Sequence, residues 1–380
     1  MQTKIVQAVE AHREAILASF SDLHAIPEWG FNEFKTAAYL QQRLEKAGIN
    51  IKKYTETGFT ADIVGSEDGP AIGLRGDIDA LPYKNEAGET YYVHACGHDS
   101  HATMVLWTTL LLKELGLVKK GTFRAIFQPA EECLTGAREM IAAGAAASLD
   151  ELYGVHIRPI QEARVGQASP ALWHSASTVA EVTIHGQAAH GARPHLGTNA
   201  IDGAALAILG LNSIWVNPAQ QWSVKVTKII GGGTASNIIP DQAIFTLDMR
   251  AASNALMDEL VRKVTAACEH GAAAVGGHAE VNIIGGVPAA EYDEEAVSYL
   301  RTAIEEIIGS KGLLPPIYTP GGEDFHQFKQ ADPKLKTAYM ALGSDCTPGL
   351  HDPKMTFDRE AILIGVKILT LAMAKRLGCQ

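Results

Sequence analysis

Residues 71–82 read AIGLRGDIDALP, an apolar run that predicts a buried β-strand and that ends at the acidic pair Asp77 and Asp79. The pattern recurs downstream, because TFRAIFQPAEE at 122–132 and ELYGVHIRP at 151–159 are also apolar runs followed by acids or an imidazole. Segments with helical periodicity separate these strands. Such alternation is typical of an α/β fold with a mostly parallel sheet. We therefore predict such a sheet, with polar side chains gathered at the carboxyl ends of its strands, where open sheets bind ligands.

The order of predicted elements changes near residue 178. From there to residue 290 the pattern is strand, helix, strand, strand, helix, strand, which is the ferredoxin-like order β-α-β-β-α-β. After residue 290 the chain returns to helices and one short strand. The sequence thus predicts a catalytic domain in two parts, 1–177 and 291–380, and an inserted lid or dimerisation domain over 178–290.

The first 50 residues predict two helices. Apolar residues at helical spacing mark the first, and Asn32 is placed to cap the second.

Composition describes a globular chain of 380 residues with 47% hydrophobic residues and a net charge of −11. No run of Lys and Arg is present, which argues against binding to nucleic-acid phosphates or to an anionic membrane. The longest apolar stretches are shorter than the roughly 20 residues of a membrane span, and the N-terminus lacks the apolar core of a secretory signal. These two observations predict a cytoplasmic protein. The five cysteines are odd in number and irregularly spaced, so we expect no disulfide framework.

The strongest local motif is HACGHDSH at 94–101, which places three imidazoles, a thiol and a carboxylate within eight residues. Thiolate and imidazole are ligands that suit Zn²⁺ and related divalent ions. The alternative is a polar helix start with a buried cysteine.

Paired carboxylates follow two of the predicted strands. Asp77 and Asp79 could form a solvated strand-end turn, and Glu131 and Glu132 could simply favour the N-terminus of the next helix. Adjacent carboxylates can also divide the work, since one can bind a cation while its neighbour acts as a general base.

Two further histidines extend the pattern. His156 ends the strand at 151–159, and His351 precedes the C-terminal helix. A lone histidine is more often structural than a ligand. Acids or imidazoles nevertheless end at least three predicted strands of one sheet, which predicts a metal site assembled from distant segments.

Nine motifs stand in chain order: DLHAIPEWGFNEFKTA, GLRGDIDALP, HACGHDSHA, FQPAEE, YGVHIRP, HGQAAHGARPHLGTNAID, GGGTASNIIPDQAIFTLDMR, GGEDF and GLHDPKMTFD. Together they resemble the M20 metallopeptidase superfamily, and within it the amidohydrolase branch of hippurate hydrolases, N-acyl-amino-acid deacetylases and auxin-conjugate hydrolases. The resemblance covers nearly the whole chain.

The resemblance implies a role for each matching residue in the predicted catalytic domain. Glu131 would be the general base, and Asp79 would orient a ligand or tune the base. Two divalent ions, Zn²⁺ or Mn²⁺ with Co²⁺ and Ni²⁺ left open, would be held by five side chains: Cys96, His98, Glu132, His156 and His351.

In the inserted domain the resemblance implies that His190 donates to the oxyanion across a dimer interface, and that Asn237 and Arg250 bind the substrate carboxylate. The alternatives are a polar loop role for His190 and a surface ion pair between Arg250 and Asp248 or Asp241. The segment between Asp79 and Cys96 is shorter than is usual for this branch, which leaves the acyl preference open.

These observations lead to one hypothesis. The chain would be a homodimeric, dinuclear metal-dependent amidohydrolase that cleaves an N-acetyl, N-benzoyl or aryl-acyl amino acid to a carboxylate and a free amino acid. The alternatives are a dipeptidase, a deacetylase of an N-acetylated biosynthetic intermediate, and a catalytically silent protein that binds an amino-acid conjugate or a metal. A thiol-redox protein is disfavoured because the sequence contains no C-x-x-C pair.

Overall fold

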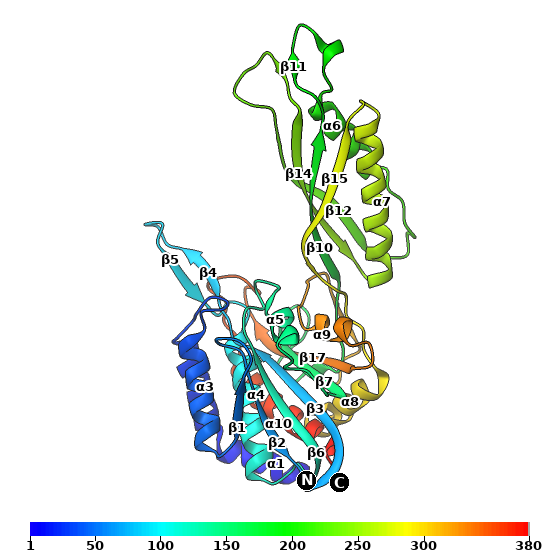
Figure 1. The fold of residues 1–380 in the computed structure, drawn as a ribbon. Helices are drawn as coiled ribbons and strands as arrows, with labels where there is room; N and C mark the ends of the chain where they lie inside the picture. The colour runs from blue at the N-terminus through cyan, green and yellow to red at the C-terminus, as the bar shows by residue number, and fades with distance from the viewer. Residues whose placement is uncertain (379–380) are drawn as a thin grey trace. The chain divides into compact units, whose positions relative to one another are not determined.

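A computed structural model describes residues 1–378, and the chain forms two units. The first unit contains residues 1–173, 291–318 and 324–378, and the second contains His174–Ala290 and Thr319–Glu323 (Figure 1). The second unit thus begins four residues before the predicted boundary at 178 and also takes in a short segment from beyond residue 290.

The first unit is built on a seven-stranded sheet with the order β1-β2-β6-β3-β7-β17-β8. Its four central strands, β6, β3, β7 and β17, pair in parallel, whereas β1, β2 and β8 are antiparallel to their neighbours. The predicted α/β class with a mostly parallel sheet is therefore confirmed. The strands are β1 (Asn50–Lys53), β2 (Phe59–Val64), β3 (Glu67–Asp77), β6 (Lys120–Gln128), β7 (Glu151–Pro159), β8 (Ala168–Ser169) and β17 (Lys336–Cys346).

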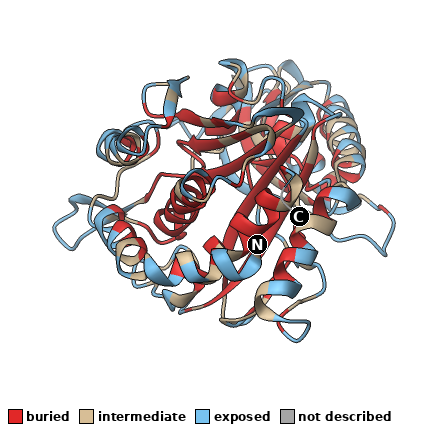
Figure 2. Ribbon diagram, turned by 90° about the horizontal axis from the view of Figure 1, so that it is seen from below, coloured by how far each residue is buried: buried red, intermediate tan, exposed pale blue. Residues whose placement is uncertain are grey.

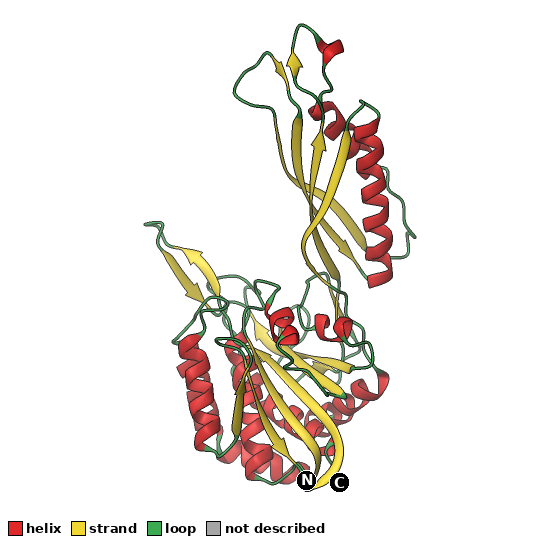
Figure 3. Cartoon of the chain, viewed as in Figure 1, coloured by secondary structure: helices red, strands yellow, loops and turns green. Residues whose placement is uncertain are grey.

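Helices cover both faces of this sheet (Figure 3). Helix α4 (His98–Glu114) is buried around almost its whole circumference, as expected of a helix enclosed between a sheet and other helices. It shares one core with α1 (Gln2–Ala11), α2 (Arg13–His24), α3 (Phe34–Lys46), α8 (Glu294–Ile308) and α10 (Glu360–Arg376). A second core, on the other face, contains α5 (Gly136–Ala142) and α9 (His326–Ala331). Figure 2 shows the central strands buried between exposed outer helix surfaces.

The N-terminal segment differs from its prediction in two places. The first predicted helix is divided at His12 into α1 and α2. The cap of α3 is not Asn32, whose side chain instead donates to the carbonyl of Gly30. The carboxylate of Glu28 accepts the N–H groups of Lys35 and Thr36, each at 3.0 Å, and so satisfies the donors at the start of that helix.

The second unit follows the ferredoxin-like order of elements. Its four-stranded antiparallel sheet has the order β12-β14-β10-β15, and α6 and α7 pack on one face of it. A separate two-stranded ladder joins β11 (Ala189–His190) to β13 (Ile238–Ile239). The main elements are β10 (Ala176–His185), α6 (Ala200–Asn212), β12 (Trp222–Gly231), β14 (Gln242–Ala251), α7 (Asn254–Ala273) and β15 (His278–Val287).

Short elements complete the chain: the hairpin of β4 (Leu81–Lys84) and β5 (Thr90–Val93), the pair β9 (Leu172–His174) and β16 (Ile317–Thr319), and the 3₁₀ turn η1 (Pro194–Leu196). Among the described residues, Cys96, Cys133, Cys268 and Cys346 are free thiols, and Cys379 lies outside them. None of the helices in residues 1–378 has both the length and the apolar character needed to cross a membrane.

Candidate metal centre

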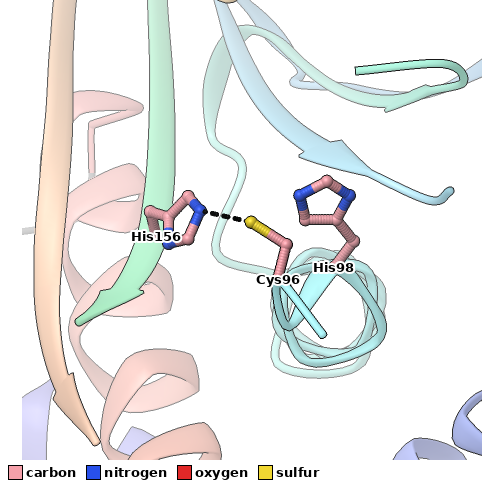
Figure 4. Close-up of side chains that lie close together, drawn as sticks. All are labelled: Cys96, His98 and His156. Carbon is pink, nitrogen blue, oxygen red and sulfur yellow. Dashed lines mark hydrogen bonds between the residues drawn. The ribbon is translucent and has the colours of Figure 1, made fainter. Parts of the chain in front are cut away.

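Three of the predicted ligands meet where β7 approaches the start of α4. His98 is the first residue of that helix, Cys96 lies just before the N-cap residue Gly97, and His156 comes from the strand (Figure 4). The Nδ1 atom of His156 lies 2.6 Å from the carbonyl oxygen of Ile157, so this nitrogen carries the proton and donates it. The lone pair on Nε2 then faces Sγ of Cys96 at 3.3 Å. This nitrogen and sulfur are oriented as two ligands of one ion would be.

Asp79 orders the other side of the centre. One of its carboxylate oxygens lies 3.0 Å from Nδ1 of His98, and the other accepts the backbone N–H of Glu132 at 3.0 Å. The first contact places the ring proton of His98 on Nδ1 and leaves the Nε2 lone pair directed into the centre. A carboxylate behind a ligating imidazole is a common arrangement at metal sites.

Two buried atoms inside the centre have no hydrogen-bond partner. They are Nε2 of His98 and Oε1 of Glu132, which lie 3.7 Å apart, and Nε2 of His351 lies 3.5 Å from the same oxygen. Buried polar atoms are rarely left unpaired in proteins. Donors about 2.0–2.3 Å from a shared tetrahedral ion lie roughly 3.3–3.8 Å apart, so these separations fit a divalent cation.

The donors fall into overlapping sets, which fits a centre for more than one ion. Each set offers ligand atoms that all lie within 4.8 Å of one another. Three of these sets are Cys96 with His98 and His156, Cys96 with Glu132 and His351, and His98 with Glu131 and Glu132.

The electrostatics of the centre depend on burial. Burial raises the pKa of the Cys96 thiol well above its usual range, with the negative charge of Glu132 adding to the effect. Burial also raises the pKa of Glu132 to about 7 and lowers that of His156 well below its usual value. Metal ligands must be deprotonated, so the thiol and the carboxyl are groups whose protons a bound cation would displace.

The loop that carries Glu131 and Glu132 has an unusual backbone. Ala130 adopts φ = 54°, a left-handed conformation that non-glycine residues rarely take. A buried carboxylate, Glu33, accepts the N–H of Ala130 at 2.9 Å and thereby holds this conformation. Glu131 is itself buried, and its Oε1 accepts the backbone N–H of Asp324 at 3.4 Å.

A buried ion network beneath the centre was not found from the sequence. Arg75 is fully enclosed and bonds Asp77, Asp324 at 2.7 Å and Gln128 at 2.9 Å. Asp324 in turn accepts the N–H of Ala137 at 2.9 Å. The available signal was an arginine inside the apolar run AIGLRG, because a buried charge requires buried partners.

His101, one of the three imidazoles of the HACGHDSH motif, is occupied elsewhere. Its Nδ1 lies 2.7 Å from a carboxylate oxygen of Asp77, and its Nε2 accepts the N–H of Ile157 at 3.1 Å. Both ring nitrogens are thus used in holding α4 to β3 and β7, which is consistent with its not having been predicted as a ligand.

The three predicted residues of the inserted domain all belong to the second unit. The exposed His190 accepts the N–H of Ala192 at Nδ1, 3.0 Å away, so its Nε2 carries the proton. The backbone carbonyl of Asn237 accepts the N–H of Gly191 at 2.7 Å, which brings the β11 and β13 segments together. Arg250 makes two 2.9 Å contacts with Asp248, as in the alternative considered above. The catalytic and substrate-binding roles of His190, Asn237 and Arg250 stay predictions.

Comparisons with known proteins cover nearly the whole chain. The sequence model of the family described as "Peptidase family M20/M25/M40" matches residues 73–375. An N-acetyl-L-cysteine deacetylase of Bacillus subtilis is 34% identical over 352 residues, covering 90% of this chain and 83% of that protein. A second B. subtilis N-acetylcysteine deacetylase is 31% identical over 357 residues, covering 90% of this chain and 92% of that protein.

Among solved structures, a B. subtilis protein described as a dinuclear metal-binding peptidase from the M20 family aligns with a TM-score of 0.81. It is 28% identical, and the alignment covers 97% of this chain and 99% of that one.

Proposed function

The chain belongs to peptidase family M20/M25/M40 and is a hydrolase of amide bonds, and from this premise we propose that it cleaves an N-acyl amino acid to a carboxylate and a free amino acid. The observation that carries the proposal is the pair Glu131 and Glu132, a buried candidate base directly beside a carboxylate whose oxygen faces two imidazoles. The similarity to two N-acetylcysteine deacetylases supports an N-acyl substrate.

We further propose that the centre takes two divalent ions, Zn²⁺ or Mn²⁺, with Co²⁺ and Ni²⁺ as alternatives. The similar B. subtilis structure is described as dinuclear, which supports this number. When bound, such ions polarise the amide carbonyl and lower the pKa of water. The residues that would hold them are Cys96, His98, Glu132, His156 and His351.

Within that centre Glu131 is the proposed proton carrier. The N–H of Asp324 holds its Oε1, and its Oε2 lies 4.0 Å from Nε2 of His98, on the side of the ligands. Oε2 is therefore the atom that would take a proton from the attacking water and pass it to the nitrogen of the leaving amine. Asp79 would keep His98 and Glu132 in their ligating orientation.

The second unit would supply groups that recognise the substrate. The Nε2–H of His190 would donate to the oxygen that becomes negative during attack, while Arg250 and Asn237 would bind the carboxylate of the amino acid. For Arg250 this requires its contacts with Asp248 to be shared with the substrate or exchanged for it.

We propose a homodimer formed through the second unit. Strand β12 is an edge of the four-stranded sheet, and Ile229 and Ile230 on it are 53% and 56% exposed. Leu209 of α6 and Trp215 are also exposed large apolar residues. Unprotected edges and exposed apolar side chains are typical of surfaces that pair with another chain.

The proposed location is the cytoplasm. Four free thiols among the described residues fit a reducing compartment.

Replacing Glu131 by Gln tests the proposed base. The variant should keep its metal, measured by elemental analysis, and lose about 10²–10⁴-fold in kcat, because the amide cannot take the proton. Glu132→Gln is the matched control, which should lose metal as well as activity. Near-normal turnover in the Glu131→Gln protein would contradict the assignment.

A substrate panel tests the proposed reaction. Acetyl-, benzoyl- and indoleacetyl-amino acids should be assayed beside dipeptides on chelator-stripped enzyme reloaded with each metal. Turnover of dipeptides alone would favour the dipeptidase alternative, and turnover of one acetylated biosynthetic intermediate alone would favour the specialised deacetylase. Metal binding without hydrolysis of any of these amides would favour the catalytically silent binding protein.

A further inference from the structure

A second cluster of metal-binding side chains lies outside the candidate centre, on the sheet of the second unit. It consists of His185 on β10, and His278 and Glu280 on β15. One ring nitrogen of each histidine and one carboxylate oxygen of Glu280 all lie within 4.8 Å of one another. None of these three residues belongs to the predicted catalytic, metal-binding or substrate-binding set.

The strand register places all three on one face of the sheet. His185 and His278 are directly opposite each other in the antiparallel pair, and their rings stack with centroids 4.6 Å apart. Glu280 lies two residues further along β15, and therefore on the same face. The intervening Ala279 packs into the helix-covered core of this unit, so His278 and Glu280 point to the face that α6 and α7 leave open.

The distances suit a shared ion better than direct hydrogen bonds. Nε2 of His185 lies 3.6 Å from Oε2 of Glu280, beyond ordinary hydrogen-bond length. Nε2 of His185 is shielded from solvent and has no hydrogen-bond partner. Two donors about 2.1 Å from one tetrahedral ion are separated by roughly 3.4 Å, so a small rotamer adjustment would bring both to ligand distance.

We propose that this cluster, the β10–β15 site, binds a third divalent cation. Two imidazoles and one carboxylate form a ligand set that selects borderline ions such as Zn²⁺, with water as the fourth ligand. The ligands come from both the central strand β10 and the edge strand β15, so the bound ion links the two strands. Because it binds only the folded sheet, it stabilises this unit and takes no part in amide hydrolysis.

Isothermal titration calorimetry tests the proposal on full-length, chelator-stripped protein that has first been given two equivalents of Zn²⁺ per chain, enough for the candidate centre alone. Further Zn²⁺ at pH 7.5 should bind with a stoichiometry of about one ion per chain. His278→Gln and Glu280→Gln should each weaken this binding at least tenfold, since even loss of a supporting group behind a ligand costs about 10–100-fold in affinity. Turnover and the metal retained in the candidate centre should not change.

His195→Gln is the matched control, because His195 is an exposed histidine of the same unit that lies outside the cluster. This variant should bind the extra ion as the unmodified chain does. The proposal is overturned if the protein given two equivalents takes up no further Zn²⁺, or if His195→Gln weakens the uptake as much as His278→Gln. Since neither outcome depends on amide hydrolysis, the test is separate from that of the proposed function.

Discussion

Asp79 illustrates how much of the candidate centre depends on one side chain. It contacts the ring of His98 with one oxygen and the backbone of Glu132 with the other, and so fixes two proposed ligands at once. The motif GDID made this carboxylate visible in the sequence. Its partners could be proposed only from the family resemblance, because they lie on other segments of the chain.

Replacing Asp79 by Asn should lower metal affinity about 10–100-fold. The amide keeps one acceptor oxygen but turns an NH₂ group toward the second donor, so either the ring of His98 or the N–H of Glu132 loses its partner. Competition with a chromogenic chelator measures the affinity. Asp62→Asn, at a partly exposed pair with Arg124, is the control and should leave it unchanged.

The buried carboxyl of Glu33 should make the free energy of unfolding depend on pH. Burial raises the pKa of its carboxyl to about 7. The hydrogen bond from Thr57 lowers this pKa, and the negative charge of Asp79 raises it further. The unfolded value is about 4.3. Because the folded pKa is the higher one, the stability contributed by the protonated form is complete below about pH 4 and is lost as pH rises through 7.

Replacing Glu33 by Gln should remove this loss. Gln stays neutral, accepts the N–H of Ala130 and can donate to the hydroxyl of Thr57. We compare the free energy of unfolding of the variant with that of the unmodified chain, using melting temperatures of chelator-treated protein. This difference should grow in favour of the variant by about 2 kcal/mol between pH 5 and pH 8. A difference that stays constant with pH would contradict the assigned pKa.

The hydrogen-bond partners of buried residues such as Arg75 could not be predicted from the sequence. Its partner Asp324 is 249 positions away, and nothing local to either residue indicates the contact. Glu33 and Ala130 are likewise 97 positions apart. Long-range hydrogen bonds follow from how strands are ordered in the sheet, which periodicity alone does not specify.

At the scale of elements, the central strands of the large sheet and the helices between them were predictable because apolar runs and Gly/Pro breaks mark them directly. The break at His12 was not, since the apolar spacing continues from α1 into α2. The cap of α3 was misassigned because the carboxylate that serves it, Glu28, comes from the preceding loop rather than from the position next to the helix.

The loop between β6 and α5 gives a prediction for an element. A Cβ on Gly136 would lie 1.7 Å from the backbone carbonyl oxygen of Pro129, so Gly136→Ala must displace the segment that carries Glu131 and Glu132. We expect a lower melting temperature together with weaker metal binding, measured by calorimetry and chelator competition.

Gly144→Ala is the control for that substitution. Gly144 has φ = 87° with open space around it, so the change should cost about 1–2 kcal/mol of stability and leave metal affinity unaltered. Equal metal affinity in the two variants would show that the loop can move without disturbing the centre.

For the whole chain, the change in the order of predicted helices and strands near residue 178 indicated a second unit. The short segment Thr319–Glu323, which joins that unit from far along the chain, had no signal in the sequence. Apart from Thr319, which ends β16, this segment has no regular secondary structure, so no periodic pattern marks it.

The proposed dimer gives a prediction at this scale. Ile230→Lys would place charge on the β12 edge and should convert a species of about 81 kDa, twice the chain mass of 40.6 kDa, to one chain in light scattering. If His190 serves the partner's centre, activity should fall with it. Ile283→Lys, a similarly exposed site on the opposite edge strand β15, is the control and should remain dimeric.

The parallel pairing of β7 with β17 bears on how the protein is made. Ala341 lies opposite His156, and the whole of the second unit is encoded between these strands. Parallel pairing across so long a connection is slow to form, whereas the second unit is largely continuous and can fold as it leaves the ribosome. His351 follows β17, so a nascent chain already exposes Cys96, His98, Glu132 and His156 before their last companion is translated. Metal capture in the cell is therefore expected to be a late step of biogenesis, after translation has passed residue 351.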